Sequence, residues 1–161
     1  MSSKVLRSMG MFALAGALVA TAACERQTTE PGHFGAVAEV EIRDRATNTL
    51  YLESHGDHWD GPGIPHLHVG EEIALNVHFF DAEGNEANLG GGEFELRVRL
   101  ADAARDGGVE GTPGIVDFSA HGDHADIEGI AEGETYLVFQ LYHGNHSDFD
   151  TMPIEFEVDD H

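Results

Sequence analysis

The stretch "EEIALNVHFFD", from Glu71 to Asp81, decides the fold class of this chain. It carries a large apolar side chain at every second position: Ile73, Leu75, Val77 and Phe79. Successive side chains of a β-strand point to opposite faces of the sheet, whereas a helix repeats after about 3.6 residues. The stretch therefore predicts a strand with one face buried and the other toward solvent.

The same alternation recurs along the rest of the chain. It is present in "AVAEVEIRD", "TLYLES", "EFELRVRL", "TYLVFQLYH" and "PIEFEVDD". After Cys24 no window of helical length has apolar residues at helical spacing, and only "ADAARD" suits a short helical turn. We therefore predict an all-β fold, an antiparallel β-sandwich of about seven to eight strands in two sheets.

Three segments resemble bacterial immunoglobulin-like domains. "VGEEIALNVHFFDAEGNE" is similar to their opening, "IEGIAEGETYLVFQLY" to their later half and "PIEFEV" to their closing strand. The resemblance runs from Val69 to Asp159 and implies an immunoglobulin-like sandwich. It implies fold rather than function, because such folds carry many unrelated sites. The segment "GGVEGTPG" and the histidine-rich loops depart from the common pattern.

The first 23 residues have the parts of a secretory signal peptide. Lys4 and Arg7 precede the apolar run "MFALAGALVA", which is too short to span a membrane. The following "TAAC" resembles the lipobox of bacterial lipoproteins, although Thr21 stands where that motif usually has a large aliphatic residue. The resemblance implies that Cys24 is acylated and becomes the N-terminus. The alternative is an ordinary secreted protein with a free thiol.

We expect three parts along the chain. Residues 1–23 are the lipoprotein signal peptide, residues 24–35 are the lipidated cysteine with a flexible tether, and residues 36–161 are the sandwich. The expected location is the bacterial cell envelope, on its periplasmic or its surface face. Contact with the membrane is expected through the N-terminal lipid only.

The chain is strongly acidic. It has 161 residues, with 30 Asp and Glu against 8 Lys and Arg, and a formal net charge of −22. Such a charge repels nucleic acid and attracts cations. We therefore exclude nucleic acid as a partner. Acidic exported proteins usually carry such charge as a solvated surface, so the expectation of a metal ion as partner rests on the histidines. An envelope protein partner stays open.

Histidines gather in turns. "HGDH" occurs at His55 to His58 and at His121 to His124, "HGNH" occurs at His143 to His146, and "HLH" contains His66 and His68. Glycine permits a tight reversal that brings two imidazoles to one ion, and imidazole with carboxylate suits zinc and its neighbours. The candidate ligands are His121, His124, His143, His146, Asp123, Asp148, His55, His58, His66 and His68.

The immunoglobulin-like topology also predicts how these turns are grouped. The hairpins at residues 120–125 and 143–152 should open at the same end of the sandwich, so that their four histidines converge on one ion. The loop from His55 to His68 should lie at the opposite end and form a second site by itself. Trp59 and Phe149, beside the turns, are expected to close the ends of the core rather than to bind a ligand.

Enzymatic interpretations fit poorly. "SAHGDH" resembles the zinc motif of metallo-β-lactamase-type hydrolases, but Ser119 stands in place of the first histidine. "HLHVG" is similar to copper-zinc superoxide dismutase, whose disulfide cysteines are missing. We therefore expect a lipoprotein that is not an enzyme. It would buffer or carry divalent transition metal, zinc first, and release it as histidines protonate at about pH 6 to 6.5. The alternative is a non-catalytic interaction or structural module without metal.

Overall fold

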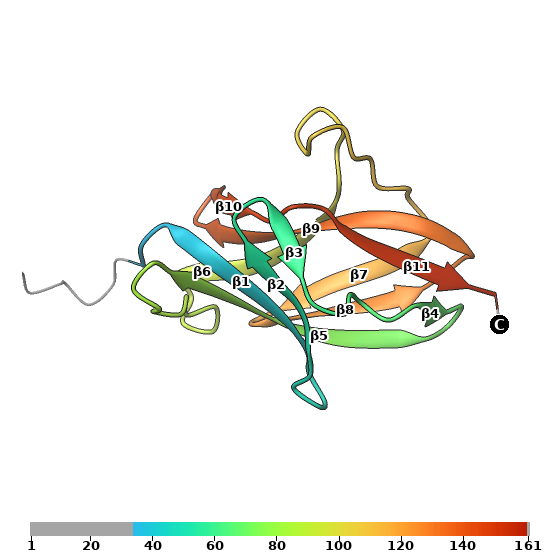
Figure 1. The fold of residues 1–161 in the computed structure, drawn as a ribbon, viewed down its shortest axis with the longest axis horizontal. Coiled ribbons are helices and arrows are strands. Elements are labelled where there is room, and N and C mark those ends of the chain that lie inside the picture. The colour runs from blue at the N-terminus through green and yellow to red at the C-terminus, as the bar shows by residue number, and fades with distance from the viewer. Residues whose placement is uncertain (1–33, 161) are drawn as a thin grey trace, which may run out of the picture. The chain divides into compact units, whose positions relative to one another are not determined.

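The computed structural model describes residues 34–160, which form eleven β-strands in two sheets (Figure 1). The strands are β1 (Val37–Asp44), β2 (Leu50–His55), β3 (His58–Asp60), β4 (Leu67–His68), β5 (Glu72–Asp81), β6 (Phe94–Leu100), β7 (Val116–His121), β8 (His124–Gly129), β9 (Gly133–His143), β10 (His146–Asp150) and β11 (Ile154–Asp159). The predicted signal peptide, the predicted lipidation at Cys24 and nearly all of the predicted tether lie outside the described residues.

The first sheet has the strand order β3-β2-β1-β5-β8-β7. In the second sheet β9 is central, because Leu137 pairs with Leu100 of β6 on one side and with Ile154 of β11 on the other. β10 lies on the same side of β9 as β11, so the two are halves of one interrupted strand. The interruption contains Pro153, which has no N–H for a strand ladder. β4 pairs in parallel with the end of β11.

This topology is that of an immunoglobulin-like sandwich. Four neighbouring strands, β1, β5, β8 and β7, face the three strands β6, β9 and β11, which is the constant-type arrangement of seven strands. The predicted fold class is therefore confirmed. The strand number is higher than seven to eight because the hairpin β2–β3 extends the first sheet, β4 adds a short edge, and the last strand is split.

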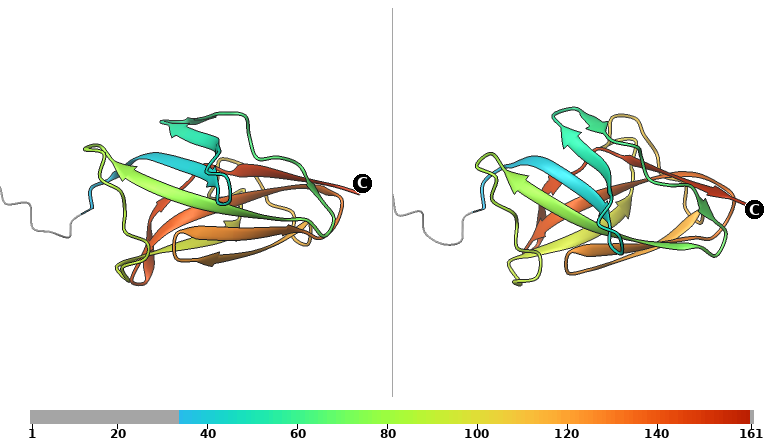
Figure 2. Two further views of the ribbon diagram at one scale, coloured as in Figure 1. Left: turned by 90° about the horizontal axis from the view of Figure 1, so that it is seen from below. Right: turned by 60° about the horizontal axis from the view of Figure 1, so that its bottom comes forward.

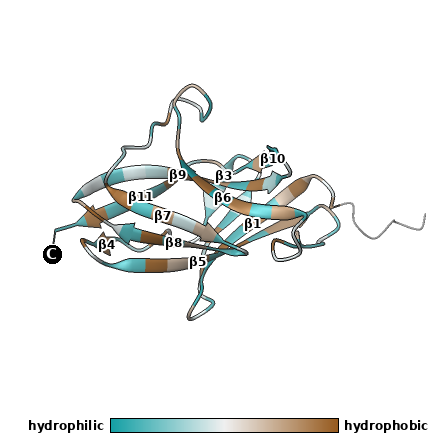
Figure 3. Cartoon of the chain, turned by 180° about the vertical axis from the view of Figure 1, so that it is seen from behind, coloured by the Kyte–Doolittle hydropathy of each residue, from teal (hydrophilic) through white to brown (hydrophobic). Residues whose placement is uncertain are grey.

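The core forms where the two sheets meet face to face (Figure 2). The four alternate apolar residues of β5 are all buried, and Leu137, Phe139 and Phe156 meet them from the second sheet. Figure 3 shows the alternation of hydrophobic and hydrophilic residues along strands such as β5. Burying each such side chain stabilises the fold by about 1.5–3 kcal/mol. As expected, Trp59 and Phe149 pack half-buried against this core.

The segment "ADAARD" forms hydrogen-bonded turns rather than a helix. Arg105 and Asp106 both donate their backbone N–H to the Asp102 carbonyl. None of the elements between Phe34 and Asp160 is a helix, so this part of the chain holds no candidate membrane-spanning helix.

Candidate metal sites

The three H-G-x-H segments fold into one and the same kind of hairpin. Each has a two-residue turn whose first residue is glycine in the left-handed region, with φ of 64° at Gly56, 61° at Gly122 and 60° at Gly144. The second turn residue, Asp57, Asp123 or Asn145, keeps a negative φ. A type II′ turn has this combination and favours glycine at its first central position. The local sequence therefore determines the turn.

This turn makes the two flanking histidines direct cross-strand neighbours. His55 pairs with His58, His121 with His124, and His143 with His146. The ring centroids of the three pairs are 6.3, 5.9 and 6.0 Å apart. Residues directly opposite each other in an antiparallel pair share one face of the sheet. Each turn thus presents two imidazoles side by side, as the sequence predicted.

A carboxylate follows each pair, two residues after the second histidine, but among the three hairpins between Phe34 and Asp160 only the third offers three ligand atoms within 4.8 Å of one another. Asp60, Asp126 and Asp148 hold this place in "HGDHWD", "HGDHAD" and "HGNHSD". Side chains two apart in a strand return to the same face. Asp60 Oδ2 lies 3.9 Å from His55 Nε2 and 3.5 Å from His58 Nε2, and Asp126 Oδ2 lies 3.9 Å from His124 Nε2. Sequence reasoning missed Asp60 and Asp126, although their common offset in the three copies was a signal.

The hairpin of β9 and β10 has the tightest cluster. The register of β10 shifts between Ser147 and Phe149, which places Asp148 in a bulge. Its Oδ2 lies 3.5 Å from His143 Nδ1 and its Oδ1 lies 2.8 Å from His146 Nε2. One ligand atom from each of the three side chains lies within 4.8 Å of the others. Two donors on one tetrahedral zinc ion are about 3.3–3.6 Å apart, so the side chains need little movement to hold one.

The hairpin of β7 and β8 is less open. The His124 side chain is only 15% exposed, and its buried Nδ1 has no hydrogen-bond partner. This nitrogen lies 3.5 Å from Oδ1 of Asp123, the carboxylate that the sequence proposed as a ligand. Ser119 Oγ lies 3.3 Å from His121 Nε2. The pair therefore has one accessible imidazole, at His121, and one that is mostly buried.

The predicted convergence of His121, His124, His143 and His146 does not occur. The two hairpins do lie at the same end, because both are next to the segment that joins β5 to β6. Gly122 and Asp123 line a hollow with residues 86–90 of this segment, and the His143 ring packs 5.3 Å from that of Phe94, the first residue of β6. Between Phe34 and Asp160, however, no set of three ligand atoms within 4.8 Å combines residues of both hairpins. β8 and β9 belong to different sheets, and packed sheets are about 10 Å apart.

The loop from His55 to His68 does not form a single site at the opposite end. β2 runs antiparallel to β1 and Glu53 pairs with Glu41, so His55, two residues later, lies level with Glu39. Glu39 in turn pairs with Phe80, near the end of β5. The turn after His55 therefore lies level with the end of β5. The hairpin of β2 and β3 therefore opens at the same end as the other two. The prediction failed for this half of the loop because β2 and β3 extend the first sheet instead of crossing the sandwich.

The other half of that loop does reach the opposite end. His66 lies against β11, where its Nε2 is 3.1 Å from Glu157 Oε2 and its Nδ1 is 3.5 Å from Asp159 Oδ2. His68 is exposed, and its backbone N–H donates to Glu71. Between Phe34 and Asp160, no potential metal cluster includes His68.

Asp150 follows the third hairpin but is engaged elsewhere. Its carboxylate accepts hydrogen bonds from Arg99 at 2.7 Å, from Gln140 at 2.8 Å and from Ser147 at 2.5 Å. Burial opposes ionisation, but the Ser147 hydroxyl and the Arg99 guanidinium hold the pKa of Asp150 below its usual range. A carboxylate with these partners is not free to bind a metal.

Comparison with known proteins adds little to this geometry. No protein-family model matches the chain, and no curated protein matches its sequence. Among solved structures, the chain is similar to the crystal structure of the S-layer protein SbsC domains 4 and 5. The identity is 12%, the match covers 74% of this chain and 75% of that chain, and the TM-score is 0.40. A likeness of this size carries no argument about function, which rests on the residues of the chain itself.

Proposed function

We propose that this chain binds divalent transition-metal ions, zinc first, through its three hairpins, and acts as a metal buffer or carrier in the bacterial cell envelope. One observation carries the proposal. The same type II′ turn occurs three times with two imidazoles on one face and a carboxylate two residues on, and at His143, His146 and Asp148 the three ligand atoms are already close together.

The proposed role is exchangeable binding rather than catalysis or a structural lock. Two imidazoles and one carboxylate give three protein ligands, so a fourth position is left for water. His143, His146 and Asp148 are exposed, which favours rapid entry and release of the ion. The net charge of −22 raises the local concentration of cations. Imidazole binds metal only when it is neutral, so acid releases the ion.

Export and lipid anchoring are part of the same proposal and rest on the N-terminal sequence. Mass spectrometry of the N-terminal peptide from the membrane fraction would show an acylated Cys24. An unmodified Cys24, or a mature chain that begins at another residue, would contradict the anchor but would leave the metal proposal untouched.

Zinc titration of the chain from Glu25 onward tests metal binding. We expect calorimetry to show binding and the melting temperature to rise, because an ion that binds only the folded state stabilises it. His143→Ala with His146→Ala should remove the tightest hairpin site. His68→Ala, which changes an exposed histidine outside the hairpins, is the matched control and should leave zinc binding unchanged.

The outcome that overturns the proposal is also clear. Binding weaker than about 100 µM at every hairpin, which corresponds to about 5.5 kcal/mol, is too weak for a buffer or carrier. That result would favour the alternative role, a non-catalytic interaction or structural module that needs no metal.

A further inference from the structure

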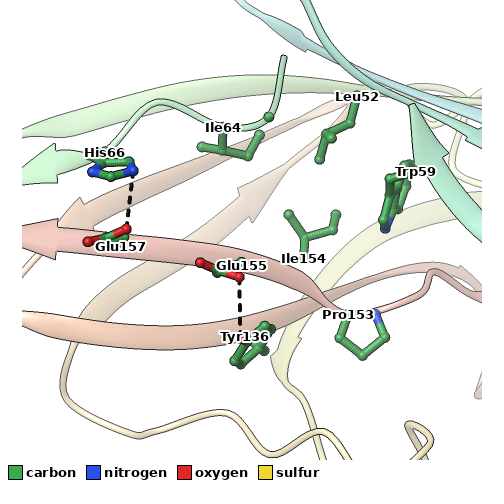
Figure 4. A pocket seen from close by; sticks show the side chains of 10 residues that line it. Leu52, Trp59, Ile64, His66, Tyr136, Pro153, Ile154, Glu155 and Glu157 are labelled. Atoms are coloured by element: carbon green, nitrogen blue, oxygen red, sulfur yellow. Dashed lines mark hydrogen bonds and ion pairs between the residues drawn. The ribbon is translucent and has the colours of Figure 1, made fainter. Parts of the chain in front are cut away.

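A different cluster lies at the end of the sandwich opposite the three hairpins. His66 comes from the connection between β3 and β4, whereas Glu157 and Asp159 come from β11. One ligand atom of each residue lies within 4.8 Å of the other two. Figure 4 shows His66 beside Glu157, with their contact marked. The sequence placed His66 with His55 and His58, so this set of three was not expected.

The backbone holds the three side chains in place. Leu67 pairs with Val158 and His68 with Asp159 in the parallel ladder of β4 and β11, and Val69 donates its N–H to the Asp159 carbonyl. The Leu67 side chain is 2% exposed and anchors the connection in the core. Glu157 and Asp159 are two residues apart in a strand, so both project from one face. The cluster is therefore built on paired strands rather than on a loose loop.

Between Phe34 and Asp160, no arginine forms an ion pair with the carboxylates around His66. Glu155 shares the outer face of β11, and Glu134 lies across from Glu157 on β9. A hydrogen bond to Glu134, with burial and the Glu155 charge, raises the pKa of Tyr136 to about 12. This surface carries concentrated negative charge that a cation would compensate.

We propose that His66, Glu157 and Asp159 bind one divalent cation at a site separate from the hairpins. One imidazole nitrogen with two carboxylate oxygens suits zinc or manganese, and zinc is the probe we choose. Imidazole and carboxylate bind a metal ion only in their unprotonated forms, so acid opposes binding. The ion also links the connection before β4 to the last strand. The inference does not depend on the hairpin sites, since no residue is shared.

A groove beside the cluster provides a local reporter. His66 and Glu157 line this groove, of about 380 Å³, together with Leu52, Ile64, Ile154 and Trp59. Trp59 is the single tryptophan of the chain, and its buried indole Nε1 has no hydrogen-bond partner in the groove. Figure 4 shows its ring on the opposite side of the groove from His66. An ion bound at His66 should therefore change the emission of Trp59.

The test counts zinc ions by equilibrium dialysis and elemental analysis of the chain from Glu25, which keeps every described residue. We expect His66→Gln to lower the saturating stoichiometry by one ion. The double variant Glu157→Gln with Asp159→Asn should do the same. Glu155→Gln, on the same face of β11 but outside the cluster, is the control and should retain the full number. The His66 side chain is 59% exposed, so its replacement leaves the core intact.

Two further arms separate this inference from the hairpin proposal. Replacing His55 and His58 together removes the histidines next to Trp59. In this double variant zinc should still change the emission of Trp59. When His66 is replaced as well, the change in emission should disappear. If only the hairpin ions are found, and His66→Gln binds as many ions as the parent chain, the inference is overturned. If one ion is found and His66→Gln removes it, the inference stands and the hairpin proposal fails.

Discussion

Three glycines hold the histidine pairs in place, because each adopts a backbone conformation that an L side chain resists. At Gly56, Gly122 and Gly144 a Cβ atom would meet nothing within 4 Å. The requirement for glycine is therefore purely conformational at these positions. Asp60, Asp126 and Asp148 contribute in a different way, by bringing charge to the face that the turn creates.

Replacing Gly144 by alanine should destabilise the chain through its backbone alone. With φ at +60°, we expect a loss of about 1–2 kcal/mol in the free energy of unfolding, together with weaker zinc binding at His143 and His146. Urea denaturation measures the first effect and calorimetry the second. Gly90→Ala is the control, because Gly90 has no positive φ and its added Cβ would make only an ordinary contact. Equal losses in both variants would contradict the turn argument.

Asp148→Asn keeps the size of the side chain and removes its charge. Because this carboxylate contacts both imidazoles, we expect zinc affinity at the third hairpin to fall about tenfold or more. Calorimetric titration provides the measurement. Asn145→Asp converts this turn to the sequence of the other two and should change affinity little. Unchanged affinity in Asp148→Asn would remove Asp148 from the ligands.

At the scale of elements, each of the three histidine pairs belongs to a single hairpin. The first is formed by β2 and β3, the second by β7 and β8, and the third by β9 and β10. The bulge in β10 distinguishes the third, since the register shift turns Asp148 toward both histidines. Elements that share no ligand should bind ions independently.

Independent hairpins predict additive losses of bound zinc. Removing His121 and His124 should abolish one site, removing His143 and His146 another, and the combined variant should lose both. Equilibrium dialysis provides the count, with circular dichroism to verify folding. A site shared by the two hairpins would instead disappear when either pair is removed, so a non-additive result would support the convergent arrangement that the described fold does not have.

At the scale of the whole molecule, an ion network ties the β6–β7 connection to the second sheet. Arg99 Nη1 lies 2.6 Å from Asp106, and Arg99 Nη2 lies 2.7 Å from Asp150. The Asp106 side chain is only 6% exposed. The hydrogen bond from Arg99 holds the pKa of Asp106 below its usual range, against the opposing effect of burial.

The network makes stability depend on pH in a definite direction. Lowered pKa values in the folded state add stability above the unfolded value of about 3.9, and this stability is lost as the pH falls through the folded values. At pH 7 we expect Arg99→Met to reduce the free energy of unfolding by about 1.5–3 kcal/mol. The difference from the parent chain should shrink as the pH falls below about 4, because the carboxylates are protonated first in the unfolded state and, at still lower pH, in the folded state.

Urea denaturation at pH 7 and pH 3, with chelator present, measures this effect. Arg97→Met is the matched control, because Arg97 pairs with an exposed glutamate and lies over the Tyr142 ring, and it should cost less than about 1 kcal/mol. A parent-to-variant difference for Arg99 that is equal at both pH values would contradict the assignment.

Local pattern by itself determined much of this protein. The alternation in Glu71–Asp81 was sufficient for a half-buried strand, because side-chain direction in a strand depends only on position. The pairing of His143 with His146 also followed from sequence, since a two-residue turn with glycine aligns its flanking residues. The same reasoning could have identified Asp60 and Asp126, because each lies two residues after the second histidine of its turn.

Only the tertiary structure decided which of these local units meet. His121 and His143 stay in separate histidine pairs because their strands belong to different sheets, whose spacing is set by the core between them. His66 meets Glu157 and Asp159 because β4 pairs with β11, a contact between segments far apart along the chain. Such pairing depends on the packing of the whole sandwich, and no local spacing of residues encodes it.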